Sequence, residues 1–189
     1  GNTPAVIDET ADIKLAVSSI LLSKTFDNGV ICASEQSVVV VDAVLDEVRR
    51  EFAARGAMLL SAAQAKKVGQ TIINDGKLNA AIVGQAAWKI ARMAGIEADP
   101  SVKVLIGEAE EIGAGEPWAY EKLSPVLALY RAADFAGAVD KAARLVAFGG
   151  VGHTSVLYTA PANEERIAAF GRALNTGRIL VNMPSSQGA

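Results

Sequence analysis

The sequence predicts an α/β fold: a three-layer α/β/α arrangement with a mostly parallel sheet, in one domain over residues 1–189. Short apolar runs alternate with longer segments whose apolar residues recur at helical spacing, which is the pattern of strand–helix units. The run Val38-Val39-Val40-Val41 has no polar alternation, as expected of a strand covered on both faces. No Pro-, Gly- or Ser-rich linker divides the chain, so a single domain with right-handed crossovers is expected.

Three strand–helix units are predicted in the first half of the chain. Their strands are residues 5–7, 37–41 and 58–60, and their helices are residues 11–24, 42–56 and 61–73. Asp8 or Thr10, Asp42 and Ser61 are the expected N-caps, because a side-chain oxygen there can accept a free backbone N–H. Asn74-Asp75-Gly76 predicts a tight turn after the third helix.

The second half continues the alternation. Helices are expected over residues 86–94, 134–148 and 162–174, and strands over residues 102–106, 126–130, 154–158 and 179–181. A loop is expected over residues 113–118. The glycine-rich run Gly149-Gly150-Val151-Gly152 leads into a strand rather than a helix, so it is not interpreted as a phosphate-binding loop.

Composition and charge exclude several classes of function. The formal net charge is −3 and the sequence shows no basic cluster, so no nucleic acid partner is expected. No apolar run reaches the roughly 18 residues of a membrane helix, so no membrane association is expected. A single cysteine cannot form an internal disulfide and fits the reducing cytoplasm. One cysteine and one histidine are too few for a zinc site, so no metal is expected.

Cys32 is the first candidate for chemistry. It lies between a predicted helix and a predicted buried strand, shortly after Asn28-Gly29, whose tight turn can present the next residues to a cleft. A catalytic cysteine acts as its thiolate and needs an adjacent base or a lowered pKa. From the residues alone, an inert cysteine packed among apolar groups is the alternative.

The segment around Cys32 resembles the active-site loop of the aldehyde dehydrogenase superfamily. Residues 23–36 contain Asp27-Asn28-Gly29-Val30-Ile31-Cys32-Ala33-Ser34, and in that family an asparagine and a glycine shortly precede the catalytic cysteine. The resemblance covers essentially the whole chain and is closest to the CoA-acylating branch, especially the aldehyde half of bifunctional aldehyde–alcohol dehydrogenases. The other segments that carry it are residues 78–85, 121–125, 149–155 and 182–188.

The resemblance implies a cytoplasmic oxidoreductase of alcohol fermentation. It implies the interconversion of acetaldehyde or another short aldehyde, CoA and NAD with acyl-CoA and NADH. Cys32 is the implied nucleophile, which carries the acyl group as a thioester, and its backbone N–H is an implied oxyanion donor. NAD is the implied cofactor, CoA the co-substrate, and a homo-oligomer, either a dimer or a filament, the implied assembly.

Two further site residues follow from the resemblance. Glu121 matches the glutamate of the family's Glu-x-Phe-Gly-Pro motif, which binds the nicotinamide ribose; here Leu123 and Ser124 replace Phe and Gly, so the loop packing is expected to differ. His153, the only histidine, is placed near the cysteine or the CoA thiol, since histidine suits proton transfer near neutrality. Without the resemblance, a solvated Glu121 and a structural His153 are the alternatives.

The resemblance also predicts that this sequence is one catalytic domain of a longer enzyme, with the cofactor-binding domain and the oxyanion-hole asparagine upstream. The isolated chain is therefore expected to be inactive or weakly active. Gly1-Asn2 is similar to the CoA-acylating variant, which lacks the glutamate that activates water in hydrolytic relatives.

Three other interpretations are open at this point. A hydrolytic, acid-forming aldehyde dehydrogenase would use water in place of CoA. A relative that reduces acyl phosphates would depend on phosphate. A catalytically silent assembly module would bury Cys32 and expose apolar strands at either end of the chain.

Overall fold

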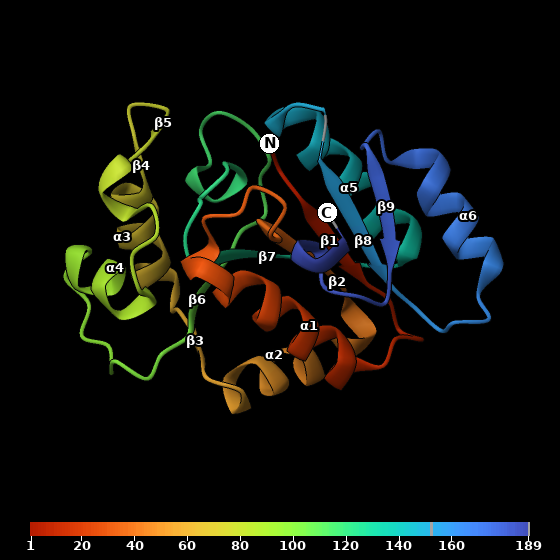
Figure 1. Cartoon of the computed structure of the whole chain (residues 1–189), viewed down its shortest axis with the longest axis horizontal. Helices are drawn as coiled ribbons and strands as arrows, with labels where there is room; N and C mark the ends of the chain where they lie inside the picture. The colour runs from red at the N-terminus through yellow and green to blue at the C-terminus, as the bar shows by residue number, and fades with distance from the viewer. Residues whose placement is uncertain (152, 189) are drawn as a thin grey trace.

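A computed structural model describes residues 1–151 and 153–188 and contains a seven-stranded sheet. Its strand order is β3-β6-β7-β2-β1-β8-β9, and every neighbouring pair is parallel (Figure 1). A two-stranded hairpin stands apart from this sheet, formed by β4 (Ile73–Asn74) and β5 (Lys77–Leu78). The strands of the main sheet are β1 (Pro4–Ile7), β2 (Ser37–Val41), β3 (Ala57–Leu59), β6 (Val104–Glu108), β7 (Val126–Ala132), β8 (Thr154–Tyr158) and β9 (Arg178–Val181).

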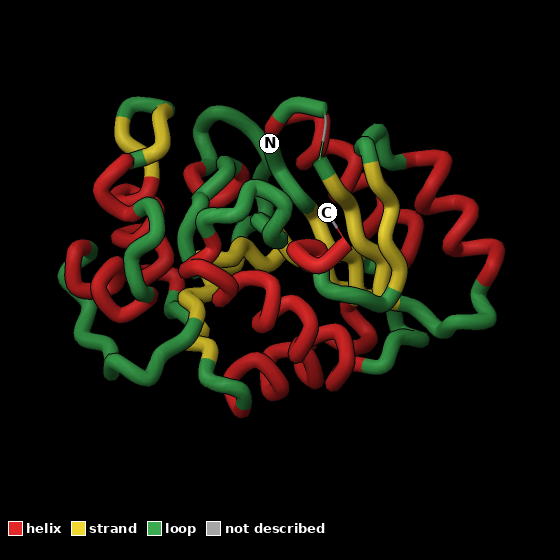
Figure 2. The backbone as a smooth tube through the Cα atoms, viewed as in Figure 1, coloured by secondary structure: helices red, strands yellow, loops and turns green. Residues whose placement is uncertain are grey.

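Helices cover both faces of the sheet, which confirms the predicted three-layer fold (Figure 2). One face is covered by α1 (Ile13–Thr25) and α2 (Leu45–Ala54), and the short α7 (Ser185–Gly188) lies against α1. The other face is covered by α3 (Ala62–Ile72), α4 (Ala87–Met93), α5 (Phe135–Gly149) and α6 (Glu164–Ala173).

In the described part of the chain, no helix is both long enough and apolar enough to cross a membrane.

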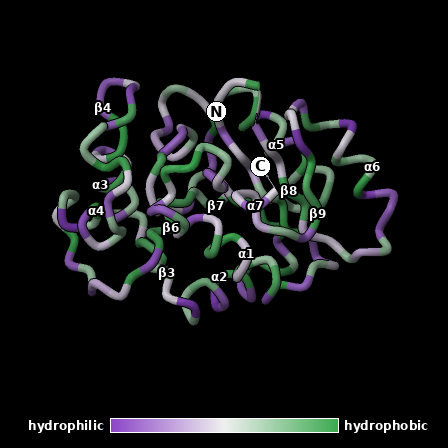
Figure 3. Tube along the Cα trace, viewed as in Figure 1, coloured by the Kyte–Doolittle hydropathy of each residue, from purple (hydrophilic) through white to green (hydrophobic). Residues whose placement is uncertain are grey.

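The valine run of β2 shows why the central strands are almost entirely apolar. Val39 and Val41 belong to the core under α3 to α6, whereas Val38 and Val40 belong to the core under α1 and α2. All four are buried, because crossover helices cover both faces of a parallel sheet. Figure 3 shows hydrophobic stretches along β8 and β9, in contrast to the hydrophilic tip of the β4–β5 hairpin.

Two predicted helix caps are wrong. Asp12 caps α1, in place of the predicted Asp8 or Thr10, because its side chain accepts the backbone N–H three residues along the helix at 3.0 Å. Asp42 does not cap α2; it begins a single 3₁₀ turn, and its carboxylate pairs with Arg131 of β7 at 3.0 Å. For α1 another suitable side chain nearby is used, whereas α2 begins after Val44 with no side-chain cap.

Other local predictions are confirmed. Ser61 caps α3 in a reciprocal capping box with Gln64. The predicted turn joins β4 to β5, with Asp75 at φ 49° and Gly76 at φ 72°, both left-handed. The hairpin strands and α7 were not predicted, since two- to four-residue elements show no periodicity.

The first strand does not fit the interpretation of an assembly module. β1 is fully buried between β2 and β8, so the expectation of exposed apolar strands at either end of the chain is wrong for this strand. β9 lies at the edge of the sheet and is partly exposed. The end of the sequence therefore supplies an edge strand, whereas its beginning supplies a central one.

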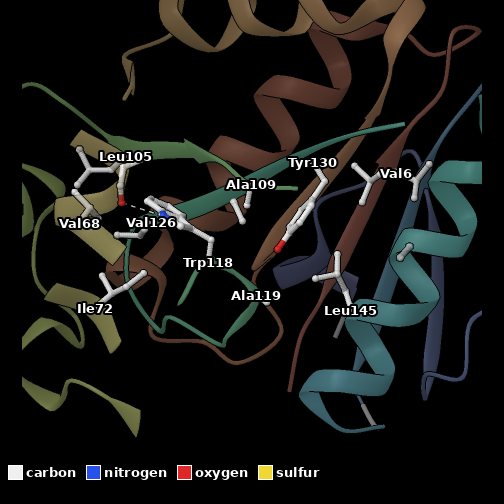
Figure 4. Packing of buried hydrophobic residues seen from close by; sticks show 14 of the residues in the cluster. Val6, Val68, Ile72, Leu105, Ala109, Trp118, Ala119, Val126, Tyr130 and Leu145 are labelled. Atoms are coloured by element: carbon white, nitrogen blue, oxygen red, sulfur yellow. Dashed lines mark hydrogen bonds between the residues drawn. The ribbon is translucent and has the colours of Figure 1, made fainter. Parts of the chain in front are cut away.

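Trp118 fills the core on the α3 side of the sheet (Figure 4). Its indole N–H donates to the Ala65 carbonyl at 3.0 Å. The ring lies directly against Gly107 of β6, where an added Cβ would come within 2.3 Å of it. Glycine is therefore required at this strand position by the close approach of a side chain.

Gly107→Ala is expected to destabilise the fold by about 1–3 kcal/mol, because the indole and α3 behind it would have to move. Gly171→Ala is the matched control, since Gly171 lies on α6 with no atom within 4 Å of its added Cβ. That change is expected to be neutral or slightly stabilising, as alanine favours a helix. Urea denaturation measures both variants, and equal midpoints would contradict the prediction.

Candidate active site

The predicted site residues lie at one edge of the sheet, where four adjacent strands begin. Cys32 precedes β2, Glu121 precedes β7, and His153 comes directly before β8. Residues 1–3 lead into β1, which lies between β2 and β8. Because the strands β7, β2, β1 and β8 are parallel neighbours, the segments that lead into them meet at the same edge (Figure 1).

A reversal of the chain presents Cys32 to solvent. After α1, three consecutive residues adopt left-handed backbone angles: Asp27 at φ 47°, Asn28 at φ 50° and Gly29 at φ 72°. Asn and Asp are the non-glycine residues that most readily adopt this conformation. Cys32 follows in the turn and is exposed, which argues against an inert cysteine buried in the core.

Gly29 brings the Cys32 loop against the loop of Glu121. A Cβ on Gly29 would lie 2.6 Å from the Ser124 carbonyl oxygen, so only glycine allows this contact. Asn28 Nδ2 donates to the Gly84 carbonyl at 3.1 Å, and the Gly84 N–H donates to the Leu123 carbonyl at 3.2 Å. Three segments that lie far apart in the sequence therefore hold one another at this edge.

Residues 1–3 touch all three predicted site segments. Thr3 Oγ1 donates to the Cys32 carbonyl at 3.4 Å, and the Gly1 backbone nitrogen lies 3.1 Å from Glu121 Oε2. A Cβ placed on Gly1 would meet His153 Cδ2 at 3.1 Å. The structure therefore gathers the predicted cysteine, glutamate and histidine around the segment that leads into β1.

Asn2 anchors that segment from within the core. It is buried, its Nδ2 donates to the Ala119 carbonyl at 2.8 Å, and its Oδ1 accepts from Ser37 Oγ at 3.3 Å. A Cβ on Gly149 would lie 2.6 Å from the Asn2 nitrogen, so glycine allows the end of α5 to pack there. Of the predicted glycine-rich run, Gly152 lies outside the described residues.

The aldehyde dehydrogenase family is matched over residues 1–189 of the chain. The chain belongs to the aldehyde dehydrogenase family. It is 60% identical to the bifunctional aldehyde-alcohol dehydrogenase of Escherichia coli, with 100% of this chain and 21% of that protein covered. The chain thus spans about a fifth of the length of this curated relative.

Solved structures of the family share the fold closely. An acetylating aldehyde dehydrogenase from Geobacillus thermoglucosidasius matches with a TM-score of 0.96 and 41% identity, over 100% of this chain and 41% of that one. An engineered glycolyl-CoA reductase with bound NADP⁺ matches with a TM-score of 0.88 and 25% identity, over 100% and 42%. The predicted family membership and the resemblance to its acylating branch are confirmed.

Sequence reasoning missed three charged residues buried beside the Cys32 loop: Lys24, Glu35 and Lys122 are fully buried. Lys24 lies four residues after Ile20, on the apolar face of α1. A lysine at such a position was the signal in the sequence that pointed to its burial.

The described residues include no group of three or more His, Cys, Asp or Glu side chains placed to hold a metal ion.

Burial moves the protonation equilibria of these groups in opposite directions. It lowers the pKa of Lys24 to about 7, although the charges of Glu35 and Glu121 favour the ammonium form. It raises the pKa of Glu35 to about 7, against hydrogen bonds from Ser23 and from the Ser185 backbone N–H. It also holds the pKa of Lys122 well below its ordinary value, with the charge of Lys24 acting in the same direction.

Glu35→Gln is expected to change how stability depends on pH. Since the pKa of Glu35 rises from 4.5 to about 7 on folding, the folded chain binds more protons than the unfolded chain between these pH values, and the wild type loses stability as pH rises. Glutamine does not titrate, so the variant does not lose stability in this way. Between pH 4.5 and pH 7, its free energy of unfolding should therefore rise relative to that of the wild type by on the order of 3 kcal/mol.

Urea unfolding at pH 4.5 and pH 7 measures this effect. Glu110→Gln, in an exposed loop position, is the control and should leave the pH dependence unchanged. A Glu35→Gln curve parallel to that of the wild type would show that Glu35 does not carry the effect.

Proposed function

We propose that these residues form the cysteine-bearing catalytic domain of a CoA-acylating aldehyde dehydrogenase. The reaction interconverts acetaldehyde or another short aldehyde, CoA and NAD with acyl-CoA and NADH. The observation that carries the proposal is the exposed Cys32, presented by a strained turn beside the segments of Glu121 and His153. The names of the relatives, which include an acetylating aldehyde dehydrogenase and a CoA reductase, support it.

The chain is proposed to be one domain of a longer enzyme. It spans 21% of the Escherichia coli relative and 41% of the Geobacillus structure. The domain that binds NAD would lie in the remaining length, so the isolated chain is expected to turn over weakly or not at all. The predicted homo-oligomer and the cytoplasmic location stay predictions.

Cys32 performs the covalent chemistry in this proposal. Its thiolate attacks the aldehyde carbonyl carbon, a C–S bond forms, and the carbonyl oxygen becomes an oxyanion. No acceptor in the described part of the chain pairs with the Cys32 backbone N–H, so this donor is free to bind that oxyanion. After oxidation, the CoA thiolate attacks the acyl-Cys32 thioester, and the bond to the Cys32 sulfur breaks to release the enzyme thiolate.

Glu121 is the proposed ligand of the nicotinamide ribose. Its side chain is 28% exposed at the edge where Cys32 lies, and a carboxylate can accept hydrogen bonds from both ribose hydroxyls. NAD bound at Glu121 would act as the hydride acceptor. Glu121 would hold the ribose and so keep the cofactor in position for reaction at the carbon bonded to Cys32.

His153 is proposed to take the proton of the CoA thiol. It is exposed and lies directly before β8, against Gly1 at the amino edge of the sheet. Transfer of this proton generates the CoA thiolate that attacks the acyl-Cys32 thioester. The two thiols have different roles: the Cys32 thiol receives the acyl group, and the CoA thiol, deprotonated by His153, removes it.

Cys32→Ala in the full-length enzyme is expected to abolish CoA-dependent NADH formation from aldehyde, because no nucleophile is left to form the thioester. The fold should persist, since Cys32 is exposed and fills no core position. NADH absorbance with and without CoA measures the activity, and circular dichroism checks the fold. Wild-type NADH formation that needs no CoA would instead indicate the hydrolytic reaction.

His153→Asn is expected to slow CoA-dependent release of the acyl group by about 10²-fold at neutral pH, in the range of general acid–base contributions. The defect should shrink at alkaline pH, where a growing share of the CoA thiol ionises without assistance. Acyl-enzyme formation in a single turnover without CoA serves as the internal control. A defect that stays constant with pH would contradict the proton-transfer role.

A further inference from the structure

Gln36, the residue directly before β2, links the loop of Cys32 to the loop of Glu121. Its Nε2 donates to the Ser34 carbonyl at 3.2 Å, within the Cys32 loop. Its Oε1 accepts the Lys122 backbone N–H at 2.9 Å, next to Glu121. Gln36 is fully buried, so one side-chain amide connects the two loops without access to water.

The side chain of Lys122 forms a second connection between the two loops. Its Nζ donates to the Gln36 carbonyl at 2.9 Å and to the Tyr120 carbonyl at 2.8 Å. The backbone before Glu121 is therefore held through the Tyr120 carbonyl, and the backbone after it through the Lys122 N–H. Both attachments lead to Gln36, and Lys24 Nζ also lies 3.4 Å from Gln36 Oε1.

A lysine is a costly residue at this position. Lys122 is fully buried, and burial together with the neighbouring Lys24 charge opposes its ammonium form, so its pKa lies well below the ordinary value. Methionine has a similar length and volume without that cost. What lysine adds is a donor to two backbone carbonyls, one in each of the two loops.

We propose that Gln36 and Lys122 are positioning residues that set the placement of Glu121 relative to Cys32. The inference rests on the proposed function, because it takes Glu121 as the ribose ligand and Cys32 as the acyl carrier. The bridge then aligns the nicotinamide with the acyl carbon, and small errors in such alignment reduce rates strongly. It has no part in bond exchange between CoA and Cys32.

Two partial reactions of the enzyme separate these roles. In the first, the Cys32 thiolate attacks acetyl-CoA, the bond to the CoA sulfur breaks, and labelled CoA thiolate then attacks the acyl-Cys32 thioester to return labelled acetyl-CoA. No oxidant or reductant takes part. In the second, acetyl-CoA is reduced to acetaldehyde with NADH as the hydride donor, which requires the ribose to be held.

The test uses Lys122→Met in the full-length enzyme, with both partial reactions measured. The exchange of labelled CoA should stay near the wild-type rate, whereas kcat/KM for NADH should fall by roughly tenfold to hundredfold, mainly through kcat, because misalignment slows the hydride-transfer step. Gln36→Met should show the same selective loss, and the double variant should lose no more than either single variant. Glu121→Ala gives the benchmark for loss of the ribose ligand.

Lys77→Met is the matched control, because Lys77 is an exposed lysine on the β4–β5 hairpin, and it should change neither rate. Equal loss of both rates in Lys122→Met and Gln36→Met would overturn the inference in favour of a merely structural role, and so would unchanged kinetics for NADH. If Lys122→Met does not fold, Gln36→Met alone decides. A wild-type enzyme without CoA exchange would instead refute the proposed function.

Discussion

The parallel register of four neighbouring strands is the constraint on which the candidate site depends. β7, β2, β1 and β8 begin at one edge of the sheet, so the four segments that precede them converge although they are spread over the whole chain. A slip of one residue in any of these strands would exchange the side chains between the two buried faces of the strand and displace the segment before it. Core packing and site geometry are therefore fixed by the same pairing.

The location of the site differs from the common arrangement in open α/β sheets, where ligands bind outside the carboxyl ends of the strands. Here the cysteine, glutamate and histidine all precede their strands. Convergence at this edge requires close backbone approaches, which explains Gly29 against Ser124 and Gly149 against Asn2. These glycines provide space between loops, so they serve tertiary packing rather than the binding of a phosphate.

The site edge of the sheet also requires charged side chains to be buried, which costs free energy. Lys24, Glu35 and Lys122 lose their hydration, and their hydrogen bonds go to Gln36, to backbone carbonyls and to the Ser185 N–H. Such groups contribute little to stability, and the hydrogen bonds of Lys122 tie the two loops to each other. This fits a site in which an exposed nucleophile has to be held by rigid surroundings, because a mobile loop would lose alignment with its substrates.

The sequence by itself determined the strand–helix alternation, and it supplied Cys32, Glu121 and His153 as candidate site residues. Periodicity predicts elements because each strand or helix buries a face, and the motif around Cys32 is local enough to be recognised without coordinates. The cap of α1 was not determined by the sequence, because Asp8, Thr10 and Asp12 all offer a suitable oxygen within a few residues.

Only the tertiary structure decided which residues meet. The order of the strands, the contact of Gly29 with Ser124, and the bridge of Gln36 to Lys122 all join positions many residues apart. Lys122 looks like an ordinary surface residue in the sequence, yet the structure buries it fully. The physical reason is that periodicity reports which face of an element is apolar, whereas long-range packing determines what that face and the adjoining loops touch.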